Sequence, residues 1–187
     1  MKNSIVIFLV FLLLFSCEKP KVRKPIVYKS SVSQFDKTIL LHQNILKRES
    51  ELFQKIIEQD TLHNYIQSPF GFYYFYNKKN GDNFAKAKSK DDVIINYEIR
   101  DVNNKILISQ DELGSENQEN KSDRLLRIDA EDFILGLHHG LKLMKEGEIV
   151  TFLIPSNLAF GATGLQGKIA SNQALIVKVK LKQILNK

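Results

Sequence analysis

The sequence predicts an α+β fold in which an N-terminal helical segment precedes five or six antiparallel strands and one short helix. Apolar residues spaced for one helical face run from Phe133 to Met144, which predicts the short helix. Asp129 is its expected N-cap, and Gly136 and Gly140 predict a close approach of another backbone. Short runs of β-branched and aromatic residues, separated by polar turns, predict the strands. A stretch without Gly or Pro, residues 31–67, has helical periodicity and predicts the helical segment.

The strands of the predicted domain, residues 69–187, follow from composition and length. Pro155 ends one of them, because proline has no amide hydrogen to continue a sheet. Asn77 to Asp91 is a polar, lysine-rich connection. The predicted strands cover residues 69–76, 93–100, 105–109, 124–128, 149–154 and 174–184.

The first residues, 1–16, predict a lipoprotein signal peptide. Residues 5–15 form an unbroken apolar run, which is too short to span a bilayer and is typical of a signal peptide. Ser16 followed by Cys17 resembles a bacterial lipoprotein box, in which cleavage precedes the cysteine and lipid is attached to it. The alternative is an ordinary signal peptide with an incidental cysteine, but Cys17 is the only cysteine and stands where lipidation needs it.

A lipidated Cys17 would hold the protein on a membrane of the cell envelope, facing the periplasm, without a spanning helix. Residues 17–30 are charged and contain two prolines, which predicts a tether. The single cysteine excludes an intramolecular disulfide framework. The net charge of +6 comes from lysines spread over the whole chain, and no nucleic-acid motif accompanies it, so we expect no nucleic-acid partner.

The helical segment, residues 31–67, is expected in two pieces with a break near Asp60 and Thr61. Its amphipathic face needs a partner. Packing on the domain that follows is favoured, and a homodimer through residues 31–67 is the alternative. A chain that starts near Ser68 is expected to fold cooperatively on its own. His42 and His63 are assigned no role.

The short helix and the residues around it resemble the signature of the FKBP-type peptidyl-prolyl isomerases. The order and spacing of the motif agree across more than thirty residues, and the resemblance covers residues 69–185. The layout is similar to that of FKBP-like lipoproteins of bacterial gliding motility. The resemblance implies a twisted sheet wrapped on the helix and rests on residues 133–136, 140–144, 147–148 and 159–164.

The implied chemistry is rotation about an X-Pro amide, which needs no nucleophile, metal or other cofactor. The barrier is about 18–20 kcal/mol. Twisting breaks the conjugation of the amide, so an apolar pocket that strips water from the carbonyl favours the twisted state. The adjacent His138 and His139 project about 100° apart on a helix and cannot share a metal ion, and we expect both to be solvated.

The resemblance places two residues at catalytic positions, Tyr97 and Phe160, the second standing where the family has Tyr. Ile108 stands where the family has Asp, so two polar groups of the family pocket are missing. The implied function is a membrane-anchored isomerase and folding factor that acts on X-Pro segments of envelope proteins. The alternative is a weak or inactive chaperone or interaction module. The implied substrate-binding residues are Leu107, Ile108, Phe133, Ile134, Leu137, Leu165, Ile169 and Val177.

Overall fold

The computed structural model describes residues 30–109 and 123–185, and the predictions for residues 1–16, Cys17 and most of the tether lie outside these ranges. The chain divides into two units, Met1–Lys37 and Thr38–Lys187, and the account below concerns the second.

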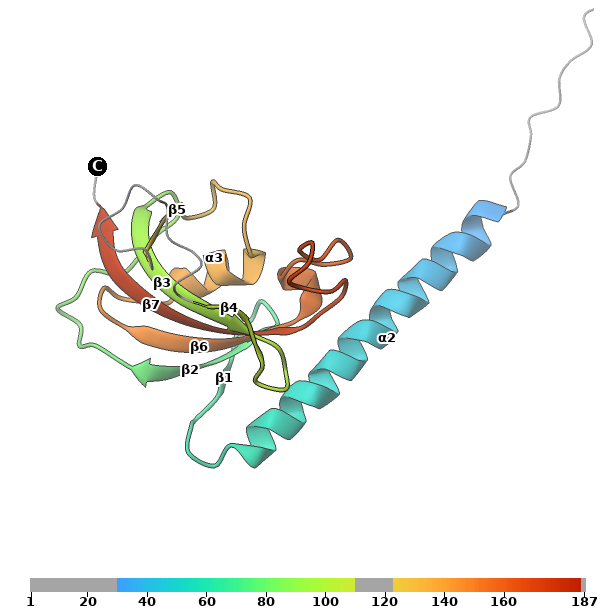
Figure 1. Cartoon of the computed structure of the whole chain (residues 1–187), viewed down its shortest axis with the longest axis horizontal. Coiled ribbons are helices and arrows are strands. Elements are labelled where there is room, and N and C mark those ends of the chain that lie inside the picture. The colour runs from blue at the N-terminus through green and yellow to red at the C-terminus, as the bar shows by residue number, and fades with distance from the viewer. Residues whose placement is uncertain (1–29, 110–122, 186–187) are drawn as a thin grey trace, which may run out of the picture. The chain divides into compact units, whose positions relative to one another are not determined.

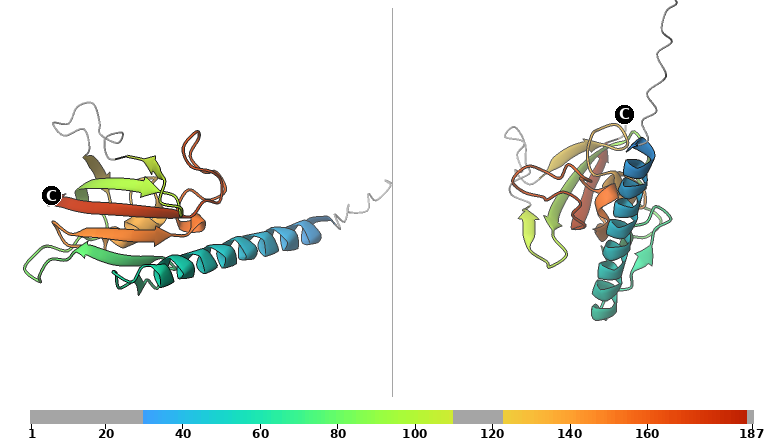
Figure 2. Two further views of the ribbon diagram at one scale, coloured as in Figure 1. Left: turned by 60° about the horizontal axis from the view of Figure 1, so that its bottom comes forward. Right: turned by 90° about the vertical axis from the view of Figure 1, so that its right-hand side faces the viewer.

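In the residues that the structure describes, seven antiparallel strands form a single sheet, in the order β1-β2-β6-β7-β3-β4, with β5 also pairing with β3 (Figure 1, Figure 2). The predicted α+β fold is confirmed, and the strand that exceeds the predicted number is the two-residue β1. The strands are β1 (Ile66–Gln67), β2 (Tyr73–Lys78), β3 (Asp92–Arg100), β4 (Ile106–Ile108), β5 (Arg124–Arg127), β6 (Ile149–Ile154) and β7 (Leu175–Leu185).

The short helix α3, Leu135–Leu141, lies in the curve of the sheet (Figure 1). Its two glycines allow this close approach. A Cβ on Gly140 would lie 2.6 Å from a ring carbon of Phe152, and one on Gly136 would lie 2.7 Å from a methyl carbon of Ile154. Both glycines thus lie where another element comes close, but the nearest atoms are side-chain atoms of β6 and not the expected backbone. A single 3-10 turn, η3 (Ser156–Leu158), follows β6.

The long helix α2, Ser30–Gln59, packs part of its length on the opposite face of the sheet. Side chains of a strand alternate between faces, and Phe152 meets α3 while its neighbour Leu153 packs with Phe53 of α2. The Glu49 carboxylate accepts hydrogen bonds from the Ser156 amide at 3.1 and 3.2 Å. The favoured prediction, packing on the following domain, therefore holds for the C-terminal part of α2.

Earlier along α2, Ile39 lies on the same face as Phe53 and is exposed, so this apolar face is not covered over its whole length. Leu40 and Leu41, which point to other sides of the helix, are exposed as well. Among the described helices, none combines the length and hydropathy needed to cross a membrane.

The prediction of a second helical piece after Asp60 is wrong. The Asp60 carboxylate ends α2 by accepting hydrogen bonds from the Leu62 amide at 3.1 Å, His63 Nδ1 at 2.8 Å and the Tyr65 hydroxyl at 2.9 Å. These bonds fold residues 60–65 into a turn. The chain then pairs Ile66 with β2 as strand β1.

The predicted N-cap of the short helix at Asp129 is also wrong, because α3 begins at Leu135 and its N-cap position is Ile134. Asp129 has a left-handed backbone, with φ of 59°, and its carboxylate pairs with Lys142 at 2.7 Å. The loop that precedes α3 is therefore fixed by contacts to the end of the helix rather than by capping its start.

Candidate active site

The apolar core between α3 and the sheet contains nine of the ten side chains that the sequence implied for the site, and these nine are here called the Tyr97 cluster. Six are buried in it, and Leu107, Phe133 and Phe160 pack against it partly buried. The buried members are Tyr97, Ile108, Ile134, Leu137, Ile169 and Val177.

The strands and α3 set these positions through register and helix phase. Ile99 of β3 pairs with Val177 of β7 and with Ile108 of β4, so three strands meet beside Tyr97, two residues earlier on the same face. Ile134 stands at the start of α3, and Leu137 follows one turn later. Residues far apart in the sequence thus form one apolar wall.

Leu165 is the one implied site residue outside the cluster, and its exposed fraction is 37%. Two backbone hydrogen bonds of 2.8 Å join it to Ile169, which is buried in the cluster. Leu165 therefore lies at the solvent side of the loop that brings Ile169 to the site.

The Tyr97 hydroxyl is the polar group of the cluster. Arg124 Nη1 donates a hydrogen bond to it at 3.4 Å, and the Tyr97 ring meets the edge of Phe133 at 5.4 Å between centroids. Burial raises the pKa of Tyr97, and the positive charges of Arg124 and Lys168 partly oppose that rise. The hydroxyl is therefore protonated at neutral pH.

Arg124 was not among the residues that the sequence implied. It lies on β5 opposite Ile95 of β3. Its guanidinium carbon stands 4.1 Å from the centroid of the Phe133 ring, a cation–π contact, and Nη2 lies 3.8 Å from a Glu131 carboxylate oxygen. The sequence from Arg124 to Ile128 predicted a strand and no functional role, and no local pattern distinguishes Arg124 from Arg127.

The prediction that both histidines of α3 are solvated is wrong for His138, which is buried. Its Nδ1 accepts a hydrogen bond from the Asp129 amide at 3.1 Å, so Nε2 carries the proton and donates to the Glu131 carbonyl at 3.1 Å. A neutral His138 thus fastens to α3 the loop that carries Glu131. His139 is partly buried and stacks on Phe70, with ring centroids 4.0 Å apart.

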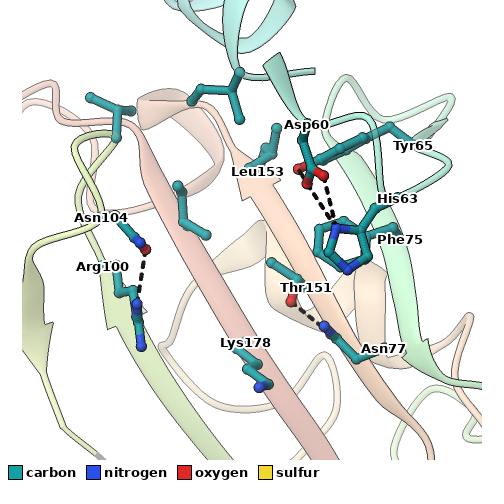
Figure 3. A pocket seen from close by; sticks show the side chains of 13 residues that line it. Asp60, His63, Tyr65, Phe75, Asn77, Arg100, Asn104, Thr151, Leu153 and Lys178 are labelled. Carbon is teal, nitrogen blue, oxygen red and sulfur yellow. Dashed lines mark hydrogen bonds and ion pairs between the residues drawn. The ribbon is translucent and has the colours of Figure 1, made fainter. Parts of the chain in front are cut away.

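A hollow of about 420 Å³ lies on the outer face of the sheet, where α2 ends (Figure 3). His63, which was assigned no role, stacks on Phe75 at 4.1 Å and pairs with Asp60. Arg100 Nη1 donates to the Asn104 side chain at 2.9 Å, and the Thr151 hydroxyl donates to Asn77 at 2.7 Å. None of the implied site residues lines this hollow.

The chain belongs to the FKBP-type peptidyl-prolyl cis-trans isomerase family. The sequence model with that description matches residues 84–182, which is more than half of the 187 residues. The matched residues contain most of the Tyr97 cluster, Arg124 and α3.

Two bacterial relatives carry the same description. A protein of Neisseria meningitidis named as a probable FKBP-type peptidyl-prolyl cis-trans isomerase FkpA is 26% identical over 160 residues, covering 85% of this chain and 55% of the relative. The FKBP-type isomerase FkpA of Buchnera aphidicola is 36% identical over 66 residues, covering 35% of this chain and 27% of the relative. The chain therefore matches about half or less of the length of these relatives.

Solved structures share the fold. A peptidyl-prolyl isomerase of Pseudomonas syringae superposes with a TM-score of 0.59 at 19% identity, covering 77% of this chain and 96% of that one. FkpA of Escherichia coli gives a TM-score of 0.58 at 18% identity, covering 98% and 82%. The second match extends over nearly the whole of this chain.

Proposed function

We propose that the protein is a membrane-anchored prolyl isomerase and folding factor of the bacterial cell envelope, and that it seats the proline of client X-Pro segments on the Tyr97 cluster. The observation that carries the proposal is that nine implied site residues, the buried Tyr97 among them, belong to one apolar core. Apolar side chains strip water from the amide, which favours its twisted state. The Tyr97 hydroxyl keeps its own proton for the substrate while it accepts a hydrogen bond from Arg124.

Turnover is expected to be weak, because two positions of the site lack the polar groups that the family signature carries. Ile108 is buried in the cluster and Phe160 packs against it, and neither can donate or accept a hydrogen bond through its side chain. The same observation favours a second candidate function, a chaperone or interaction module that binds proline-containing segments without accelerating their isomerisation.

The test measures isomerisation of X-Pro peptides by NMR exchange spectroscopy, beside the refolding of a denatured client protein. The Tyr97→Phe variant keeps the ring and removes the hydroxyl, and it should lower kcat/KM by about tenfold. Tyr73→Phe is the control, because the Tyr73 hydroxyl is bonded to Gln54 on the opposite face. Native turnover that both variants leave unchanged would mean that the site lies elsewhere. Refolding activity without turnover would favour the chaperone.

Membrane anchoring through lipid on Cys17 is part of the proposal. The apolar run of residues 5–15 and the position of Cys17 support it. A Cys17→Ser variant should appear in the soluble fraction, and a variant that stays processed and fully membrane-bound would contradict the anchor. Service in gliding motility is tested by deleting the gene in a gliding bacterium and measuring colony spreading.

A homodimer through residues 31–67 is a further part of the proposal. The exposed Leu40 and Leu41 of α2 support it, because exposed apolar side chains on a helix favour association. Analytical ultracentrifugation should show a dimer that the double change Leu40→Glu and Leu41→Glu dissociates. A monomer at every concentration would contradict the dimer.

A further inference from the structure

A cationic side chain stands beside the hydroxyl of the candidate site and is held there by an aromatic ring. The planar guanidinium of Arg124 lies over Phe133 and donates through Nη1 to Tyr97. The Glu131 carboxylate is 3.8 Å from Nη2, which is an ion-pair distance longer than a hydrogen bond. An arginine has five N–H donors in a fixed fork, which suits it to bind a carboxylate with two parallel hydrogen bonds.

Positive charges dominate the electrostatic environment of the Tyr97 hydroxyl. Lys168 acts on Tyr97 in the same sense as Arg124, since both favour the ionised form of the hydroxyl. Glu131 offsets part of this charge, but its side chain is 39% exposed and water screens it. The side chain of Arg124 is 31% exposed, so a substrate group can reach the guanidinium.

The hydrogen bond to Tyr97 fixes where a substrate must lie. The Tyr97 oxygen accepts from Arg124, so its own proton points to another acceptor. In an X-Pro segment seated on the cluster, the carbonyl of the residue before proline would be such an acceptor. Arg124 Nη1 lies 3.4 Å from the Tyr97 oxygen, so the side chain of the same substrate residue would then come close to the guanidinium.

We propose that Arg124 is a positioning and specificity-determining residue, and that the site prefers segments in which an acidic residue, Glu or Asp, precedes proline. The inference rests on the proposed function, in that it takes the Tyr97 cluster as the seat of proline. Arg124 contributes twice: it orients the Tyr97 hydroxyl and it pairs with the acidic side chain. Arg124 on β5 thereby supplies hydrogen bonds and charge that the apolar side chains of Ile108 and Phe160 cannot supply.

The experiment compares three peptides that differ only in the residue before proline, Glu, Gln or Lys, and measures both binding by calorimetry and turnover by NMR exchange. The native protein should prefer the Glu-Pro over the Lys-Pro peptide by about three- to tenfold, the range expected for a partly exposed ion pair. The preference should shrink in 1 M salt, because screening shortens the reach of the charges.

Variants separate specificity from a merely structural role. Arg124→Gln should make the Glu-Pro and Lys-Pro peptides equivalent, Arg124→Glu should reverse their order, and Arg124→Lys should keep part of the acidic preference. Arg100→Gln is the matched control: the Arg100 side chain is 33% exposed and pairs with Glu98, but it lies on the other face of the sheet. It should leave the ratio unchanged. Urea unfolding of each variant identifies any that fails to fold, and the Lys variant retains the test in that case.

The outcomes distinguish this inference from the proposed function. Turnover that is equal for Glu-Pro and Lys-Pro peptides, or a preference that survives Arg124→Gln, overturns the role of Arg124 and leaves the isomerase intact. Acid-selective binding without turnover supports Arg124 as a specificity residue and overturns the isomerase. Failure to bind any of the three peptides overturns both.

Discussion

Phe53 should carry much of the free energy that holds α2 on the outer face of the sheet. Its exposed fraction is 1%, it packs with Leu153 and Ala174, and the Tyr73 ring meets it edge-on at 6.3 Å. Replacing a buried Phe by Ala removes this burial and leaves a cavity, at a cost of about 3–5 kcal/mol in a large core. The cluster around Phe53 is small and can partly collapse, so we expect about 3 kcal/mol for Phe53→Ala.

The assay is equilibrium unfolding in urea, followed by far-UV circular dichroism and tyrosine fluorescence, with linear extrapolation to water. Leu52→Ala is the control, because Leu52 is the preceding residue of the same helix and is 41% exposed. It should change the free energy of unfolding by less than about 1 kcal/mol. Coincident transitions by the two probes would show that α2 unfolds together with the sheet.

A free energy of unfolding that Phe53→Ala lowers by less than about 1 kcal/mol would refute this reasoning. The docking of α2 would then add little, and a chain that starts near Ser68 would keep the stability of the whole protein. If the expected loss is found, the same truncation should still fold, as the sequence predicts, but with lower stability, because it would uncover Leu153 and Ala174.

Three further predictions concern single side chains. Burial raises the pKa of Glu49 more than the hydrogen bonds from Ser156 lower it. The contribution of this carboxyl to the stability of the fold is therefore largest below its ordinary pKa and is lost as the pH rises through the pKa of the folded state. Glu49→Gln should then raise the urea midpoint at pH 7 and have little effect on it at pH 4. Gly140→Ala should lower the free energy of unfolding by about 1–3 kcal/mol, because the new methyl would overlap the Phe152 ring, and an unchanged midpoint would contradict that packing. Phe160→Tyr should raise kcat/KM on a Leu-Pro peptide by up to about tenfold, provided that the new hydroxyl bonds the substrate carbonyl more strongly as the amide twists.

Strand β6 shows what the sequence alone can predict. Its bounds, Ile149–Ile154, are those expected from a run of β-branched and aromatic residues that Pro155 ends.

Residues 61–67 show the opposite case. Their apolar spacing fits a helix, but Asp60 closes a turn with three hydrogen bonds, and Ile66 then finds a partner in Tyr74. Pairing with the next strand overrides the local helical period, and although Tyr74 lies only eight residues after Ile66, the spacing of apolar residues does not show which of them will pair.

The start of α3 could not be predicted for a related reason. Asp129 has the side chain of a helix cap, and acidic residues follow it, so local rules favour a helix there. The Asp129 amide is instead satisfied by the ring of His138, nine residues later, and its carboxylate by Lys142. The buried His138 thus binds Asp129, which local rules would place at the start of the helix. This contact depends on the fold of the loop against α3, and the local sequence does not show it.

Arg124 and Arg127 show the same limit of sequence-based prediction at the candidate site. Both belong to one short strand, and composition treats them alike. Register separates them: Arg127 lies opposite Asp92 and donates two hydrogen bonds to its carboxylate, at 2.6 and 2.8 Å, which uses its fork in an ion pair. Arg124 lies opposite an apolar residue, so its guanidinium extends to Phe133 and the Tyr97 hydroxyl instead. The apolar wall of the site could be predicted from the family signature. Its positively charged side chain could not, because only the strand register shows that Arg127 lies opposite an acid and Arg124 does not.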